Sequence, residues 1–302
     1  MKYMPSNKGF LGIDKAEAQL IEKPKAEIIP FGLETSVSYG GGTAKGPQAM
    51  LKASHQVELF DDEFWCEPVR KYGVITAREP KVSRNLPKAL SQLEKMVENA
   101  LKAERFPLVF GGEHSITAAA IRPFAARFKD LVVLHLDAHA DLRDGYQGQY
   151  FSHASAIRRV LDYKNIKVVS FGIRNISETE IPFLEKNRHR IKIFWAREKE
   201  QWHLKEALQW MKGKPVYITF DLDGFDASLM PATGTPEPGG LFWDDAMKII
   251  REVAKVSRYV GGDINELAPK PTMHGCDFIA AKLAYKILNY TFMLSHRNLK
   301  RK

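Results

Sequence analysis

The sequence predicts a single-domain α/β protein with a mostly parallel sheet and helices on both faces of that sheet. Short β-rich apolar runs alternate with helical patterns, and the segments between runs are long enough for crossover helices. The chain has 302 residues, 44% of them hydrophobic, which is enough to bury a sizeable core. Because no linker, repeat or low-complexity tract divides the chain, we expect one domain over residues 1–302.

Five apolar runs are the predicted strands, and β-branched or aromatic residues are common in them. In chain order they are 106–110, 131–136, 166–171, 216–220 and 259–264. Crossover helices are predicted within 90–101 and 244–256, and a helix-like stretch within 114–121. Pro47 directly follows Gly46, which predicts a turn that opens another helix. Ligands of such sheets bind at the carboxyl ends of the strands, so chemistry is expected there.

The charge balance is basic, with 45 Lys and Arg against 36 Asp and Glu and a formal net charge of +9. An excess of this kind is typical of proteins that bind nucleic acid or acidic membranes. Here the basic residues are scattered, and four of them lie in the last six positions, namely Arg297, Lys300, Arg301 and Lys302. The pattern therefore favours a basic solvated surface and predicts no nucleic-acid partner.

The sequence also predicts the compartment. Two cysteines, Cys66 and Cys276, are too few for a disulfide framework or a thiolate zinc site, which favours a reducing environment. The N-terminal segment lacks the apolar run of a signal peptide. No apolar stretch approaches the roughly 18–20 residues that span a bilayer. We therefore expect a cytoplasmic protein without a membrane partner.

Acidic and imidazole side chains follow three of the predicted strands. One His follows the first strand, an Asp-x-His-x-Asp pattern follows the second, and an Asp-x-Asp pattern follows the fourth. Spacing by two places side chains on one face of an extended chain. Three strand ends thus present six groups toward one region, and these are His114, Asp137, His139, Asp141, Asp221 and Asp223.

These six groups predict a metal site. A single Asp after a strand usually caps a helix or starts a turn. Four carboxylates in one region, however, would repel one another and could not all ionise without compensating cations. Six ligands are more than one tetrahedral zinc needs, so the pattern indicates two metal ions. Oxygen-dominated ligation with imidazole suits Mn²⁺, with Mg²⁺, Fe²⁺, Ni²⁺ or Co²⁺ as alternatives.

Three segments resemble the signatures of the ureohydrolases, the arginase and agmatinase family. They are 111–115, 137–141 and the long, very specific run 220–241. Segments 36–39 and 42–47 resemble the N-terminal part of the family, and 263–269 resembles the agmatinase form of a late segment. The resemblance covers about 29–290, which implies the arginase/deacetylase fold with short terminal extensions.

Two departures from the family pattern are visible in these segments. Glu113 replaces a more usual Asp, and Ala227 replaces a common Pro. Neither position is a predicted metal ligand, so both leave the predicted metal site intact.

The resemblance implies a binuclear manganese hydrolase that cleaves a small cationic guanidino compound to urea and an amine. It assigns all six groups to the metals and Asp141 also to a proton-accepting role. His153 matches the family's proton-shuttling His, and Glu266 matches its guanidinium-binding Glu. Two bound ions meet the need for a strong nucleophile, because they lower the pKa of water from about 15.7 toward neutrality. The family also implies a homo-oligomer, a trimer or a hexamer.

We expect the segment 141–150 to contact the substrate tail, the end of the molecule far from the guanidinium group, and so to determine which guanidino compound binds. Arginases carry an Asn two residues after the last ligand of this motif, where this chain has Arg143, and they carry paired Asp residues where it has 175–177. The groups with which arginases bind the α-amino acid end of arginine are therefore missing, which favours agmatine as the substrate. Hydrolysis of agmatine gives putrescine and urea and is a step in polyamine metabolism. Arg143 would repel an ammonium tail unless Asp144 or another acid pairs with it. Guanidinobutyrate and related guanidino acids rank next, followed by aminopropyl-agmatine and arginine.

Other readings fit the sequence less well. Segment 40–46 resembles a phosphate-binding loop, but such a loop has Lys followed by Ser or Thr directly after its final Gly, and here Pro47 follows Gly46. No nucleophile elbow surrounds Ser115, which disfavours a serine hydrolase. A single-zinc deacetylase would share the fold but would not need six ligands. The alternative from another class is a basic binding protein with a vestigial metal site.

Overall fold

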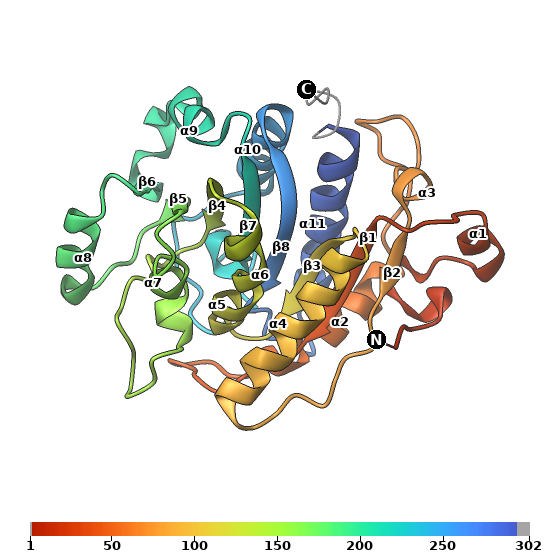
Figure 1. Ribbon diagram of the computed structural model, residues 1–302, viewed down its shortest axis with the longest axis horizontal. Helices are drawn as coiled ribbons and strands as arrows, with labels where there is room; N and C mark the ends of the chain where they lie inside the picture. The colour runs from red at the N-terminus through yellow and green to blue at the C-terminus, as the bar shows by residue number, and fades with distance from the viewer. Residues whose placement is uncertain (1, 295–302) are drawn as a thin grey trace.

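A single eight-stranded sheet forms the centre of the protein (Figure 1). The computed structural model describes residues 2–294, so the basic C-terminal cluster at Arg297, Lys300, Arg301 and Lys302 lies outside the described residues. The strand order is β2-β1-β3-β8-β7-β4-β5-β6, and every pair is parallel. The predicted α/β class with a parallel sheet is therefore confirmed.

The five predicted strands are all present, as β3, β4, β5, β7 and β8. Three further strands, β1, β2 and β6, extend the sheet on both sides. The bounds are β1 Ala26–Phe31, β2 Val74–Thr76, β3 Phe106–Gly111, β4 Leu131–Leu136, β5 Ile166–Ile173, β6 Ile191–Trp195, β7 Pro215–Asp221 and β8 Arg258–Asn265.

The helices begin and end close to the predicted positions. The crossover helix expected within 90–101 is α4, which starts earlier because Asn85 caps it by accepting a hydrogen bond from Lys88 N. The stretch 114–121 divides into a 3-10 turn, η4, and a short α5. The bounds are α1 Lys15–Gln19, α2 Gly46–Ser54, α3 Val69–Tyr72, α4 Leu86–Lys102, η4 His114–Ile116, α5 Thr117–Ala120, α6 Arg122–Arg127, η5 His153–Ser155, α7 Ala156–Val160, α8 Ile181–Lys186, α9 Leu204–Met211, η8 Leu222–Gly224, α10 Trp243–Val256 and α11 His274–Met293.

Two hydrophobic cores lie on opposite faces of the sheet. Successive residues of β4 alternate between them: Val132 and Leu134 face one core, and Leu131 and Val133 face the other. Helices α2, α9, α10 and α11 cover the first face, and α4 to α8 cover the second (Figure 1). Strands buried on both faces explain the near-continuous apolar runs in the sequence.

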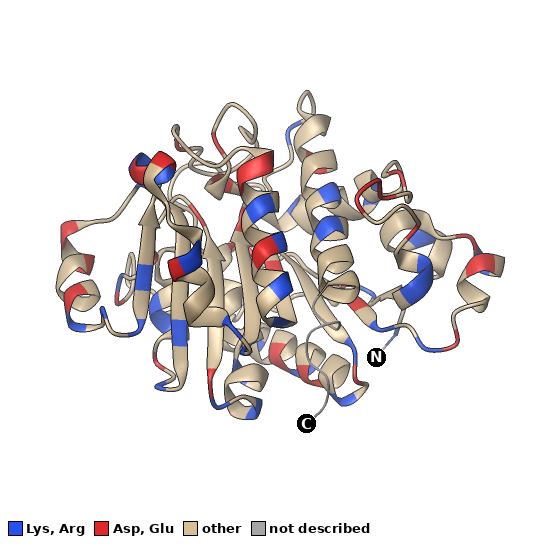
Figure 2. Cartoon of the chain, turned by 90° about the horizontal axis from the view of Figure 1, so that it is seen from above, with Lys and Arg blue, Asp and Glu red and all other residues tan. Residues whose placement is uncertain are grey.

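Charged residues of both signs are interspersed on the outer helices. Figure 2 shows this mixture along the helices over the sheet, for example on α10. Within residues 2–294, no helix has the length and apolar character needed to cross a membrane.

Candidate active site

The predicted site residues meet at the carboxyl edge of the sheet. Strands β3, β8, β7 and β4 are consecutive neighbours, so the segments that follow them lie side by side. His114 begins η4 after β3, Asp221 ends β7, and Asp223 lies in η8. Gly112 lets the backbone at Leu33 pack closely against the segment that follows β3, since a Cβ on Gly112 would lie 2.0 Å from the carbonyl oxygen of Leu33.

All six predicted metal ligands come together in two groups that share Asp137. In the first, Nδ1 of His114 lies 3.1 Å from Asp137 Oδ2, 3.0 Å from Asp141 Oδ2 and 3.4 Å from Asp221 Oδ2. In the second, Nδ1 of His139 lies 3.0 Å from Asp223 Oδ2 and 3.6 Å from Asp137 Oδ1. One oxygen of Asp137 faces each group, which is the arrangement of a carboxylate between two ions.

The hydrogen bonds around His114 fit a metal ligand. Its Nε2 lies 2.8 Å from Thr219 Oγ1, and the Thr219 hydroxyl donates to Asp263 Oδ1 at 2.6 Å. Nε2 must therefore carry the ring proton and donate it to Thr219, which leaves a lone pair on Nδ1. That nitrogen is buried, and among residues 2–294 the carboxylate oxygens of Asp137, Asp141 and Asp221 surround it at 3.0–3.4 Å without forming a hydrogen bond of good geometry. An imidazole held by its other nitrogen in this way is typical of metal sites.

The carboxylates need compensating cations. Burial, followed by the neighbouring Asp137 carboxylate, raises the pKa of Asp141 to about 6. Burial, with the charges of Asp223 and Asp137, raises the pKa of Asp221 well above its usual value. Divalent cations bound among these oxygens would hold them ionised, so the donor set fits two metal ions.

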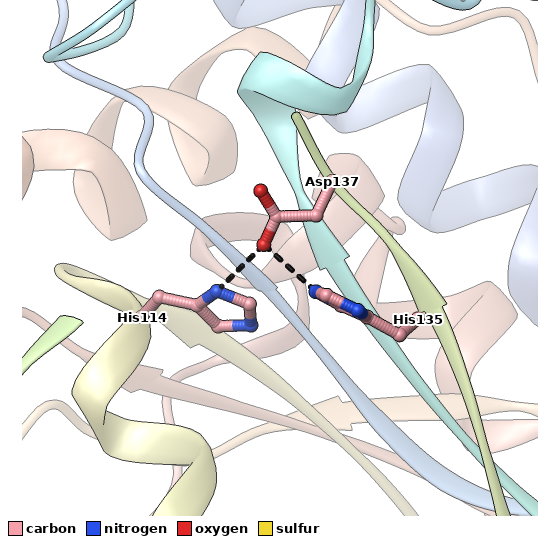
Figure 3. A group of neighbouring side chains, drawn as sticks. All are labelled: His114, His135 and Asp137. Atoms are coloured by element: carbon pink, nitrogen blue, oxygen red, sulfur yellow. Dashed lines mark hydrogen bonds and ion pairs between the residues drawn. The ribbon is translucent and has the colours of Figure 1, made fainter. Parts of the chain in front are cut away.

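One residue of this cluster was missed by the sequence analysis. His135, in β4, is fully buried, and its Nε2 lies 2.8 Å from Asp137 Oδ2 (Figure 3). Its Nδ1 lies 3.0 Å from Ser170 Oγ on β5. The potential ligand atoms of His114, His135 and Asp137 lie within 4.8 Å of one another. The every-second-residue pattern of Asp137, His139 and Asp141 extends back to His135. His135 was not predicted because it lies inside the apolar run 131–136, which indicates a strand.

His153, at the start of η5, lies in the wall of the same cavity. Its Nδ1 is 3.0 Å from Ser36 Oγ, and its Nε2 is 2.8 Å from Ser38 Oγ. Burial lowers the pKa of His153 to about 4, so the imidazole is neutral at pH 7. Glu113, one of the two departures from the family pattern, positions this loop by accepting a hydrogen bond from Ser36 N at 2.6 Å.

Glu266 and Arg143 also line the cavity, which has a volume of about 220 Å³. Glu266 follows β8 with a φ of 68°, and its carboxylate accepts a hydrogen bond from His114 N at 2.6 Å. Desolvation raises the pKa of Glu266 well above its usual value. Asp144 lies apart, with its side chain 70% exposed and paired to Arg159 at 2.6 Å and to Arg158 at 3.3 Å. The pairing of Asp144 with Arg143 that would have neutralised Arg143 is therefore not formed, and a substrate role for Asp144 stays a prediction.

Carboxylates and imidazoles at the carboxyl edge of a parallel sheet, around a small cavity, are the arrangement expected of a metal-dependent hydrolase with an α/β fold. The chain belongs to the arginase family, whose profile matches residues 24–290. This confirms the resemblance, which the sequence signatures placed over about 29–290.

Individual relatives have names that agree with the family. An N(1)-aminopropylagmatine ureohydrolase of Synechocystis is 34% identical over 274 residues, 87% of this chain and 88% of the relative. An agmatinase of Bacillus cereus is 32% identical, over 82% of this chain and 85% of its own length. The crystal structure of an agmatine ureohydrolase of Thermoplasma volcanium matches with a TM-score of 0.82 at 25% identity, covering 94% of each chain. The chain is thus an agmatinase-like hydrolase of this family.

Proposed function

We propose that the chain is a binuclear manganese enzyme that hydrolyses agmatine to putrescine and urea. One observation carries the proposal: two His and four Asp converge at three strand ends in a cavity that also holds Glu266 and His153. When bound, two divalent ions would supply an acidified water and offset the carboxylate charge. The first group would hold one ion, the His139 group the other, and Asp137 both. Mn²⁺ suits this donor set, with Ni²⁺ or Co²⁺ as alternatives.

The remaining groups of the cavity have separate roles in this proposal. Glu266, which is not one of the six predicted metal ligands, binds the guanidinium head through opposite charge, because a cation beside the carboxylate favours its ionised form. Asp141 accepts a proton as the tetrahedral intermediate collapses. His153 is neutral at pH 7 because burial lowers its pKa to about 4, so it first takes up on a ring nitrogen the proton that Asp141 has accepted and then passes that proton to the departing amine.

A sequence comparison favours aminopropyl-agmatine as the second candidate substrate. The Synechocystis relative, named an N(1)-aminopropylagmatine ureohydrolase, is more similar in sequence than the B. cereus agmatinase. A guanidinobutyrase of Pseudomonas aeruginosa is 28% identical over 87% of this chain. We retain aminopropyl-agmatine, guanidinobutyrate and arginine as alternative substrates, and a basic binding protein as the alternative from another class.

We further propose a single ureohydrolase domain, a cytoplasmic location and a trimer or hexamer.

The substrate proposal is tested by urea release from a panel of guanidino compounds. With the Mn²⁺-loaded enzyme we expect agmatine to have the highest kcat/KM among agmatine, aminopropyl-agmatine, guanidinobutyrate, guanidinopropionate and arginine. A parallel Ni²⁺-loaded sample controls for the metal. A higher kcat/KM for any other member would reassign the substrate, and urea from none of them would favour the binding-protein alternative.

A further inference from the structure

Three glutamates line the cavity outside the metal cluster, and their hydrogen bonds distinguish them. Glu180 is fully engaged, since its two oxygens accept from Leu142 N at 2.7 Å and from Ser177 N at 2.6 Å. Glu266 accepts from His114 N beside the metal ligands. Glu237 accepts from Asn175 Nδ2 at 2.7 Å through Oε1 alone. Within residues 2–294, Oε2 of Glu237 has no hydrogen-bond or ion-pair partner. Oε2 of Glu266 is free in the same way, but Glu266 is bonded to the backbone of His114, so Glu237 offers the free carboxylate oxygen away from that metal-ligand candidate.

The backbone holds Glu237 in a fixed position near the metal edge. Asn175, which donates to its side chain, forms an isolated parallel bridge with His139. The backbone carbonyl of Glu237 accepts a hydrogen bond from Arg174 Nη2 at 2.8 Å. The Arg174 guanidinium also binds the carbonyls of Gly172, Asp223 and Phe225, so its donors are turned toward backbone oxygens. A carboxylate fixed in this way is preorganised for a cationic ligand.

Arg143 is the one Lys or Arg on the described wall of the cavity, and its positive charge opposes the negative charge of Glu237 in attracting a substrate tail. Its guanidinium lies 5.1 Å from the centre of the Tyr146 ring, in cation–π contact. The cavity thus carries a fixed anion, Glu237, and a cation stacked on an aromatic ring. Glu237 would attract an ammonium tail, whereas Arg143 would attract a carboxylate tail.

We propose that Glu237 binds the ammonium group at the far end of the substrate, so that the site selects guanidino amines over guanidino acids. This inference rests on the proposed ureohydrolase function and deepens it by naming the residue that reads the tail. Glu180 is used by backbone N–H groups, and Glu266 by the guanidinium end in the proposed function, so Glu237 is the glutamate of the cavity wall left for the tail.

The variant Glu237→Gln tests this role because Gln keeps the shape and the acceptor for Asn175 but removes the charge. We expect kcat/KM for agmatine to fall about 10–100-fold, as for loss of a charged hydrogen bond, while kcat/KM for guanidinobutyrate is unchanged or rises. Arg143→Gln should lower only the guanidinobutyrate value. The exposed Glu178→Gln is the matched control and should change neither. An equal fall for both substrates, or no fall for agmatine, would overturn the proposal.

Binding without turnover separates this inference from the proposed reaction. The metal-loaded wild type should bind putrescine more tightly than 4-aminobutyrate in calorimetry, since the two amines differ only at the tail. Glu237→Gln should abolish that preference. If the wild type releases no urea from any guanidino compound, the proposed function fails, yet the preference for putrescine and its loss in Glu237→Gln would still support Glu237. Equal affinities in the wild type, or an unchanged preference in the variant, would refute it.

Discussion

Replacing Asp221 by Asn is expected to remove at least one metal ion per chain and to abolish urea release. Asp221 Oδ2 lies 3.4 Å from His114 Nδ1, while Oδ1 accepts a hydrogen bond from Asp223 N at 2.9 Å. Asn keeps the shape and that hydrogen bond but supplies no anionic ligand. Because even loss of an outer partner of a metal ligand costs about 10–100-fold, we expect turnover to fall by more than about 100-fold.

Metal content, turnover and stability should be measured together on this variant. The exposed Asp244→Asn is the matched control and should keep both ions and full activity. In chelator, Asp221→Asn should unfold at a temperature equal to or above that of the wild type, because it removes one of several carboxylates that repel one another. Near-normal turnover at full metal occupancy would refute the role of Asp221 as a ligand.

Replacing His153 by Ala is expected to slow turnover about 10²–10⁴-fold, the contribution typical of a positioned acid–base group. Both metals should stay bound, because the contacts of the ring are with Ser36 and Ser38 rather than with a ligand. Imidazole added to the solution should restore part of the lost rate, since it can occupy the space of the missing ring.

Ser38→Ala is the matched control for His153. It removes the partner of Nε2 and keeps the ring, so its kcat should fall less than that of His153→Ala. An unchanged kcat in His153→Ala would remove the shuttle role. Loss of metal from that variant would instead make His153 part of the scaffold of the site.

The central strands could be predicted because each is a compact apolar run buried on both faces. The three missed strands lie beyond them. β2 is only three residues long, β1 contains Glu27 and Pro30, and β6 is an edge strand that contains Lys192. Polar residues and Pro weaken the apolar pattern, and it is pairing with neighbouring strands that makes these segments extended.

The six metal-binding candidates could be predicted because their signal is local: each pattern directly follows a strand. Other residues of the site join it through contacts between distant segments. Ser38 is 115 positions from His153, and Glu237 is 62 positions from Asn175. No local spacing indicates such pairs, so the structure was needed to place the serines beside His153 and to give Glu237 a free oxygen.

The central requirement of the proposed reaction is a pair of metal ions at this edge of the sheet. The most direct test is to remove metal with a chelator, add Mn²⁺ back in known fractions, count bound ions by elemental analysis and measure urea release from agmatine. We expect no urea without metal and full recovery as the count approaches two per chain. Urea release from fully chelated protein, or a plateau of two bound ions with no activity on any guanidino compound, would contradict the account.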